Sequence, residues 1–176
     1  MSVQYAESIV VMGVAAAGKT SVGSALAHHL GYRFIDGDDL HPEANKRKMS
    51  QGVPLDDADR TPWLARVGAE LHDSSEPLVV TCSALKRAYR DQIRRVAPGT
   101  VFVHLTGTVE LLEARMAART GHFMPPSLLV SQLATIEDLG NDEAGFAVDV
   151  AGNIDQIVDE TAARLQTQAY SALAEN

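Results

Sequence analysis

Short apolar runs alternate along the chain with longer segments in which apolar residues recur every three or four positions. The short runs have the length and β-branched content of buried strands, whereas the longer segments have the spacing of amphipathic helices. Such alternation is typical of a parallel sheet with helices on both faces. The pattern predicts an α/β fold whose five strands cover residues 9–12, 33–35, 78–82, 101–105 and 146–150.

Capping residues mark several helix boundaries in this pattern. Thr108 precedes an amphipathic segment over 109–118, and a threonine side chain is a common helix N-cap. Thr61 and Pro62 predict a second helix start, because proline suits the first helical position. Residues 119–126 contain a glycine and two prolines, which interrupt the helical pattern. We expect a lid segment near 119–126.

The segment after the first predicted strand fits the phosphate-binding pattern G-x-x-x-x-G-K-[ST]. Its glycines let backbone N–H groups turn inward around a phosphate. Lys19 supplies positive charge to the β- and γ-phosphates, and Thr20 offers a hydroxyl to Mg²⁺ and opens a helix whose dipole favours anions. The chain is therefore predicted to bind a nucleoside triphosphate. The expected contacts are Gly13, Val14, Ala15, Ala16, Ala17, Gly18, Lys19, Thr20 and Ser21.

Two aspartates follow the second predicted strand, at the sheet edge where open α/β folds bind ligands. Asp36 and Asp38 are two residues apart, so their side chains share one side while the chain stays extended. Phosphoryl transfer uses one carboxylate near Mg²⁺ and another that accepts the proton of the attacking hydroxyl. We expect Asp36, with Thr20, in the metal role and Asp38 as the base. A solvated turn after the strand is the alternative interpretation.

Basic residues form several clusters on an otherwise acidic chain. Arg115 and Arg119 are four residues apart, a spacing that places two side chains on one helix face, here leading into the predicted lid. A guanidinium over the γ-phosphate stabilises transition-state charge, which predicts catalysis by Arg119 and nucleotide binding by Arg115. Packing or salt bridging is the alternative for Arg115. Three further cations have the chemistry to clamp an anionic, hydroxyl-rich acceptor: Lys48, Arg60 and Lys86.

Composition narrows the class of protein. The net charge of −8 argues against a nucleic acid or an anionic membrane as partner, because both would repel the chain. Cys82 is the only cysteine, so no intrachain disulfide can form, and we expect a reducing, cytoplasmic location. The first apolar run is too short to cross a bilayer and leads into the phosphate loop, so neither a signal peptide nor a membrane span is expected. With 176 residues and 45% hydrophobic content, the chain has the size of one domain, 1–176.

Five longer segments resemble those of gluconate kinases, a family of small P-loop sugar-acid kinases, over roughly residues 8–138. They cover residues 36–42, 45–49, 52–64, 82–91 and 121–125. The resemblance implies the P-loop kinase fold of shikimate and adenylate kinases. It also implies ATP-dependent phosphorylation of D-gluconate at its 6-hydroxyl, Mg²⁺ as cofactor and a homodimer. His41 and His122 fall inside these segments, so contacts to substrate or phosphate are expected of both.

The sequence departs from that family in two places. The family loop usually has serine and glycine before Gly-Lys, whereas this chain has alanine at 15–17, and residues 138–145 also differ from the usual pattern. Two other functions are alternatives. A different small-molecule kinase of the same fold, acting on shikimate, a nucleoside or a nucleotide, is separated from gluconate kinase only by the resemblance. A nucleotide-dependent switch such as a GTPase lacks support, because no Asn-Lys-x-Asp signature is present.

Overall fold

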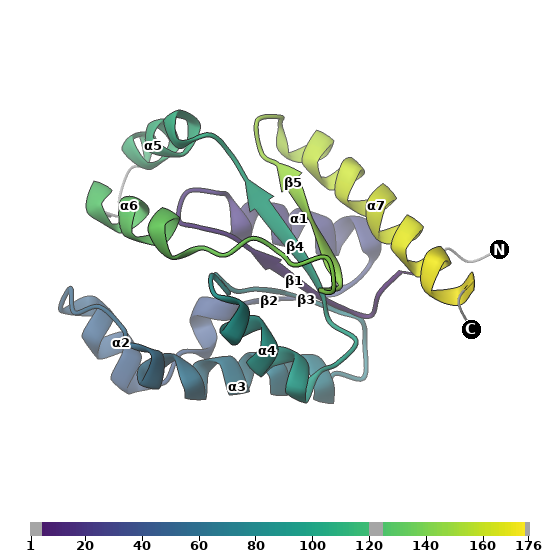
Figure 1. The fold of residues 1–176 in the computed structure, drawn as a ribbon, viewed down its shortest axis with the longest axis horizontal. Coiled ribbons are helices and arrows are strands. Elements are labelled where there is room, and N and C mark those ends of the chain that lie inside the picture. Colours follow the sequence, from purple (N-terminus) through teal and green to yellow (C-terminus); the bar gives the residue numbers. More distant parts are fainter. Residues whose placement is uncertain (1–4, 120–124, 175–176) are drawn as a thin grey trace.

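A computed structural model describes residues 5–119 and 125–174 of the chain (Figure 1). Within these ranges five strands form one parallel sheet, in the order β2-β3-β1-β4-β5. The strands are β1 (Ser8–Met12), β2 (Arg33–Asp36), β3 (Leu78–Thr81), β4 (Val101–Thr106) and β5 (Gly145–Asp149). The helices are α1 (Lys19–Leu30), η1 (Gly37–Leu40, a 3₁₀ turn), α2 (Glu43–Ser50), α3 (Asp57–Asp73), α4 (Arg87–Val96), α5 (Val109–Ala118), α6 (Pro126–Thr135) and α7 (Ile154–Ala174).

The sheet separates two apolar cores, as expected for a doubly covered parallel sheet. Along the central strand β1, Ile9 and Val11 face the core under α1 and α7, whereas Val10 and Met12 face the core under α3 and α4. Figure 1 shows these two helix pairs on opposite sides of the strands. The predicted α/β class, the parallel sheet and the strand positions are confirmed to within one or two residues at each end.

The helix boundaries test the capping predictions. Thr108 caps α5 as predicted, because its side chain accepts a hydrogen bond from the N–H of Leu111. The predicted start at Thr61 and Pro62 is wrong. The helix α3 begins at Asp57, where the residue before it, Asp56, forms a reciprocal capping box with Asp59, and Pro62 lies inside the helix. The capping box gives hydrogen-bond partners to two backbone N–H groups at the start of the helix, which outweighs the single backbone hydrogen bond that the proline removes.

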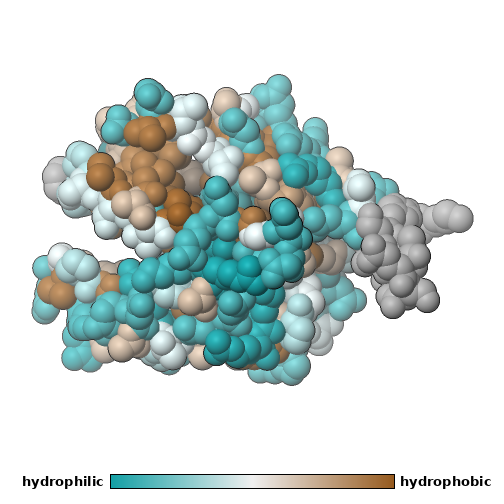
Figure 2. Space-filling model, viewed as in Figure 1, coloured by the Kyte–Doolittle hydropathy of each residue, from teal (hydrophilic) through white to brown (hydrophobic). Residues whose placement is uncertain are grey.

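The carboxyl ends of the strands meet at one edge of the sheet, and the loop between β1 and α1 lies there beside α6 (Figure 1). In the same view, the space-filling surface is hollowed between the part that carries α5 and α6 and the part that carries α2 (Figure 2). This is the edge where open α/β sheets bind ligands. None of the described helices is both long and apolar enough to cross a membrane.

Candidate active site

The phosphate loop joins β1 to α1 in a backbone conformation that requires glycine at two positions. Gly13 has a φ of 147°, and a Cβ there would lie 2.9 Å from the carbonyl oxygen of Leu105 on the neighbouring strand. Gly18, immediately before α1, has a φ of 88°. Ala16 also has a positive φ, 65°, a conformation that costs an L-residue about 1–2 kcal/mol. The loop keeps its shape without a glycine at position 16 and carries that strain.

Lys19 folds back over this loop. Its Nζ donates to the carbonyl oxygen of Val14 at 3.0 Å. Removal of the ammonium group from water lowers the pKa of Lys19, and the positive charge of Arg119 lowers it further, whereas Asp38 and Asp36 raise it. These four charged groups are therefore close enough to interact. An incoming polyphosphate would meet a cationic group already placed at the loop.

Asp36 is the centre of the polar contacts next to the loop. Its carboxylate accepts from the hydroxyl of Thr20 at 2.9 Å, from the hydroxyl of Thr81 at 3.1 Å and from the N–H of Asp38 at 3.0 Å. Hydroxyl and carboxylate oxygens are suitable ligands for Mg²⁺, which is usually held by one or two carboxylates together with substrate phosphates. The Thr20–Asp36 pair fits such an ion. Among the described residues, no group of three or more His, Cys, Asp or Glu is placed to hold a metal.

The chain turns immediately after Asp36, so the expectation of an extended segment through Asp38 is wrong. Gly37 lies so close to β3 that a Cβ would be 1.8 Å from the carbonyl oxygen of Thr81, and the backbone there enters η1. The indole N–H of Trp63, from α3, donates to the Gly37 carbonyl at 2.7 Å and fixes the turn. Asp38 is thus placed by a 3₁₀ turn, with its backbone tied to Asp36.

The carboxyl group of Asp38 has the electrostatics of a base. Its pKa is raised, first by partial removal from water and then by the negative charge of Asp36, whereas Lys19 lowers it. A carboxylate with a raised pKa accepts a proton more readily than an ordinary aspartate. Asp38 combines this property with a place beside the phosphate loop.

His41 directly follows η1, and its side chain is buried. Its ring stacks on Trp63 with centroids 4.1 Å apart, and Nδ1 is 3.2 Å from the amide nitrogen of Asn45. Burial lowers the pKa of His41 to about 4, and the charges of Arg60 and Lys46 act in the same direction. The imidazole is therefore neutral at physiological pH and supports the turn that carries Asp38.

The three cations predicted to bind the acceptor lie around the first turn of α3, and each contacts a carboxylate there. Lys48 pairs with Asp59 at 2.7 Å, and Lys86 pairs with Asp57 at 3.3 Å. Arg60 donates to the carbonyl oxygen of Leu55 at 2.6 Å and lies 4.0 Å from Asp57. The hydroxyl of Tyr89 also donates to Asp57, whose pKa this bond and Lys86 lower. The structure thus brings the three cations to one region and supplies their counter-charges.

Arg115 and Arg119, at the end of α5 and just after it, differ in their surroundings. The helix ends at Ala118, so Arg119 lies just beyond it and does not share a helical face with Arg115. Arg115 donates to the carbonyl oxygen of Val150 at 2.6 Å, a contact that ties α5 to the end of β5. This contact favours a packing role for Arg115 over nucleotide binding. His122 and most of the predicted lid lie outside the described residues.

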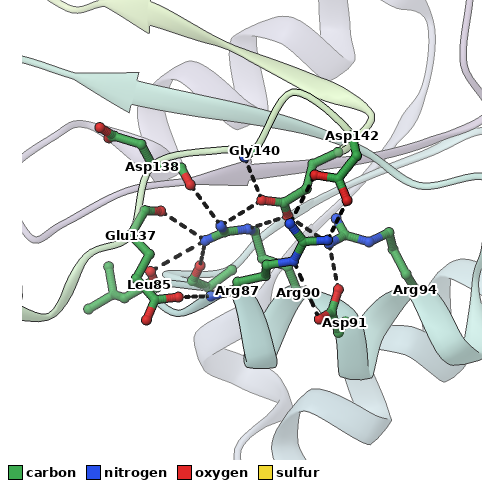
Figure 3. A network of polar contacts seen from close by, with 11 residues as sticks. Leu85, Arg87, Arg90, Asp91, Arg94, Glu137, Asp138, Gly140 and Asp142 are labelled. Atoms are coloured by element: carbon green, nitrogen blue, oxygen red, sulfur yellow. Dashed lines mark hydrogen bonds and ion pairs between the residues drawn. The ribbon is translucent and has the colours of Figure 1, made fainter.

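A buried ion-pair network links α4 to the segment 137–143 (Figure 3). Arg90 is fully buried, and its guanidinium makes two hydrogen bonds to Glu143, at 2.7 and 2.8 Å. It also donates to four carbonyl oxygens, those of Ala84, Leu85, Glu137 and Asp138. One guanidinium therefore joins the segment before α4, which carries Lys86, to the segment after α6.

Sequence reasoning missed several of these residues. Thr81 and Asp57 hold Asp36 and Lys86 in place, yet an isolated threonine at a strand end or an aspartate in an acidic cap gives no functional signal. The acidic run at 56–59 could have been recognised as a set of counter-charges for the basic clusters. Arg90 and Glu143 are 53 positions apart, and only the fold brings them together.

The loop, the Thr20–Asp36 pair and the parallel sheet define a P-loop kinase. A family model described as shikimate kinase matches residues 15–166. Shikimate kinase from Aquifex aeolicus has the same fold, with a TM-score of 0.59 at 17% identity over 92% of this chain and 98% of that one.

Two gluconokinases are much more similar. The gluconokinase of Gluconobacter oxydans is 46% identical over 163 residues, which cover 91% of this chain and 92% of that protein. The crystal structure of a gluconokinase from Sinorhizobium meliloti superimposes with a TM-score of 0.90 at 52% identity, covering 98% of this chain and 99% of that one. The chain belongs to the gluconokinase family, within the shikimate kinase-like group, and it is a kinase.

Proposed function

We propose that this kinase transfers the γ-phosphoryl group of ATP to the 6-hydroxyl of D-gluconate, giving 6-phosphogluconate and ADP. The observation that carries the proposal is the meeting of a phosphate loop with Asp36 and Asp38 at the sheet edge, beside cations on α2, on α3 and immediately before α4. The first part suits a nucleoside triphosphate, and the second suits an anionic acceptor. The gluconokinase relatives supply the identity of that acceptor.

The acceptor side is argued from charge and exposure. Lys48 and Lys86 make ion pairs whose partners are partly exposed, with side-chain exposures of 40% and 18% for Lys48–Asp59 and 36% and 67% for Lys86–Asp57. Such pairs contribute little to stability in water and exchange partners readily. The carboxylate of gluconate is a suitable new partner for Lys86 and Arg60. The protein carboxylates and the Tyr89 hydroxyl of this region can form hydrogen bonds with the hydroxyl groups of gluconate.

The chemical step follows from the placement of Asp38. Its carboxylate accepts the proton of the 6-hydroxyl while the hydroxyl oxygen attacks the γ-phosphorus; the bond to the β–γ bridging oxygen breaks, and ADP leaves. Lys19 and Arg119 offset the charge on the transferred group. Mg²⁺, which Thr20 and Asp36 would hold, neutralises phosphate charge when bound. Backbone N–H groups of the loop orient the nucleotide.

A coupled assay of ADP release tests this function. Purified protein is given ATP and Mg²⁺ with D-gluconate, shikimate or a nucleoside monophosphate as the acceptor. We expect turnover with gluconate and none above background with the others, and mass spectrometry should find 6-phosphogluconate. Faster turnover with shikimate or a nucleotide would replace gluconate as the acceptor while leaving the kinase class intact.

Three further features are part of the proposal. A homodimer is expected from the family resemblance, and a cytoplasmic location is expected from the single cysteine, Cys82. Burial raises the pKa of the Cys82 thiol to about 12, so the thiol stays protonated. A lid near 119–126 remains a prediction, to be tested by hydrogen exchange with and without nucleotide and gluconate.

A further inference from the structure

The peptide group between Val14 and Ala15, in the middle of the phosphate loop, is held at both ends by side chains. Its carbonyl oxygen accepts from Nζ of Lys19 at 3.0 Å. Its N–H donates to Oε1 of Gln132, on α6, at 2.6 Å. A backbone N–H can only donate, so the Gln132 atom that faces it must be the amide oxygen. The sequence separation of 117 residues means that only the fold brings α6 to the loop.

The position of this peptide relates it to the terminal phosphates. In a loop of this type the lysine reaches the β- and γ-phosphates, and backbone N–H groups cradle the anion. Since Nζ of Lys19 is 3.0 Å from one end of the peptide, the other end lies at the same part of the loop. The partly negative oxygen of Gln132 therefore occupies an N–H group that an anion would otherwise use.

A phosphate oxygen and the Gln132 amide oxygen cannot share this N–H without repulsion, because both are acceptors. A glutamine side chain has a way to remove the conflict. Rotation of its terminal amide by half a turn replaces the oxygen with the NH₂ group, which donates. The same side chain that satisfies the loop without nucleotide then becomes a donor to the phosphate.

We propose that Gln132 is a phosphate-binding residue of the nucleotide site, contributed by α6. It accepts from the Ala15 N–H in the nucleotide-free enzyme and donates to a terminal phosphate oxygen of bound ATP. Through this contact, α6 would add to the loop a side chain that can reverse its hydrogen-bonding role. This inference rests on the proposed use of ATP.

The test compares Gln132→Glu with Gln132→Ala. An ionised glutamate can still accept from Ala15, so the nucleotide-free protein should keep its thermal midpoint, but it cannot donate and it repels phosphate. Calorimetric titration with a nonhydrolysable ATP analogue and Mg²⁺ should show binding weakened by about tenfold to a hundredfold, the range for a hydrogen bond to a charged group. Gln132→Ala should weaken binding less, because water can take the vacated place. ADP, which lacks the γ-phosphate, should be affected less than the analogue by Gln132→Glu.

Gln166→Glu provides a matched control, because Gln166 lies in the second half of α7, which starts at the carboxyl edge of the sheet and runs away from it. This variant should bind the analogue as the unmodified protein does. Wild-type affinity in Gln132→Glu would overturn the inference. So would a lowered thermal midpoint with unchanged affinity in Gln132→Ala, which would make Gln132 a structural tie only. Failure of the unmodified protein to bind the analogue would instead overturn the proposed use of ATP, and with it this inference.

Discussion

The molecule holds cation–carboxylate pairs in two contrasting regions. In the network on α4, Arg90 and Glu143 have side-chain exposures of 0% and 1%, and the guanidinium also donates to backbone carbonyl oxygens (Figure 3). Around the start of α3, Lys86 and Asp57 are exposed to 36% and 67%. A buried charge cannot give up its partner without a large free-energy cost, whereas an exposed one can exchange its partner for water or a ligand. The comparison indicates that the first region serves the scaffold, and it supports the proposal that the second binds the acceptor.

The largest effect on activity is expected for Asp38, whose charge is needed for the chemical step and not for stability. Asp38→Asn should lower kcat by roughly 10²–10⁴, the range for a positioned acid–base group, because the amide cannot take the proton. The thermal midpoint and the affinity for the ATP analogue should stay close to those of the unmodified enzyme. Collapse of nucleotide affinity with high residual turnover would instead place Asp38 in the metal site and make Asp36 the candidate base.

Glu143→Gln should produce the largest loss of stability. It leaves the Arg90 guanidinium buried without its counter-charge, which typically costs about 3–5 kcal/mol. Denaturant unfolding measures the change, and KM for gluconate should be unaffected in the fraction that remains folded. A loss no greater than that of a surface substitution would contradict the scaffold assignment.

Acid should weaken the same region. Burial alone would raise the pKa of Glu143, but hydrogen bonds from Arg90, Gly140 and Arg94 outweigh it and lower the pKa from 4.5 to about 2. A carboxyl whose folded pKa is lowered stabilises the protein above its unfolded pKa, and that contribution, about 3 kcal/mol, is lost as the pH falls from about 4.5 to 2. Unfolding free energies measured over this range should fall more steeply for the unmodified protein than for Glu143→Gln. Parallel curves would contradict the pKa assignment.

Lys86→Met tests the acceptor region. KM for gluconate should rise about tenfold, as expected for the loss of one charged contact to a ligand, while KM for ATP stays the same. The thermal midpoint should hardly change, because the ion pair with Asp57 is exposed. A rise in KM for ATP instead of gluconate would move Lys86 to the nucleotide side.

The smallest effect is expected for Asp57→Asn, which makes the same carboxylate-to-amide change as Glu143→Gln but in the exposed region. The asparagine can still accept from Tyr89, and the cations around it remain hydrated. The denaturation midpoint should therefore move far less than in Glu143→Gln. Equal shifts in the two variants would remove the distinction between the regions.

The sequence predicted the nucleotide half of the site better than the acceptor half, for a physical reason. The phosphate loop is a local motif whose function depends on backbone conformation, so eight consecutive residues after an apolar run were enough to predict a nucleotide-binding loop. The loop motif and the position of Asp36 at the end of a strand predicted that Thr20 and Asp36 share one site, and the structure places their side chains in contact at 2.9 Å. By contrast, the partners of Lys48 and Lys86 come from another helix, and a list of cations does not say which carboxylate each will meet.

The errors in the prediction have a similar origin. Pro62 suggested a helix start because local rules favour it there, but the capping box at Asp56 and Asp59 decided the boundary five residues earlier. The chain does not run extended from Asp36 to Asp38 but enters a 3₁₀ turn at Gly37, which the indole of Trp63 on α3 holds through a tertiary hydrogen bond. The role of Arg90 required the packing of three segments and had no local signal.

A crystal structure of the complex with D-gluconate and a nonhydrolysable ATP analogue would show whether the exposed ion pairs exchange partners for the acceptor while the buried pair stays intact. We predict that the Lys86 ammonium leaves Asp57 for the gluconate carboxylate, that the 6-hydroxyl lies within hydrogen-bond distance of the Asp38 carboxylate, and that the Arg90–Glu143 pair is unchanged. Gluconate bound elsewhere with Lys86 still paired to Asp57, or a ligand-bound state in which Arg90 and Glu143 have separated, would contradict it.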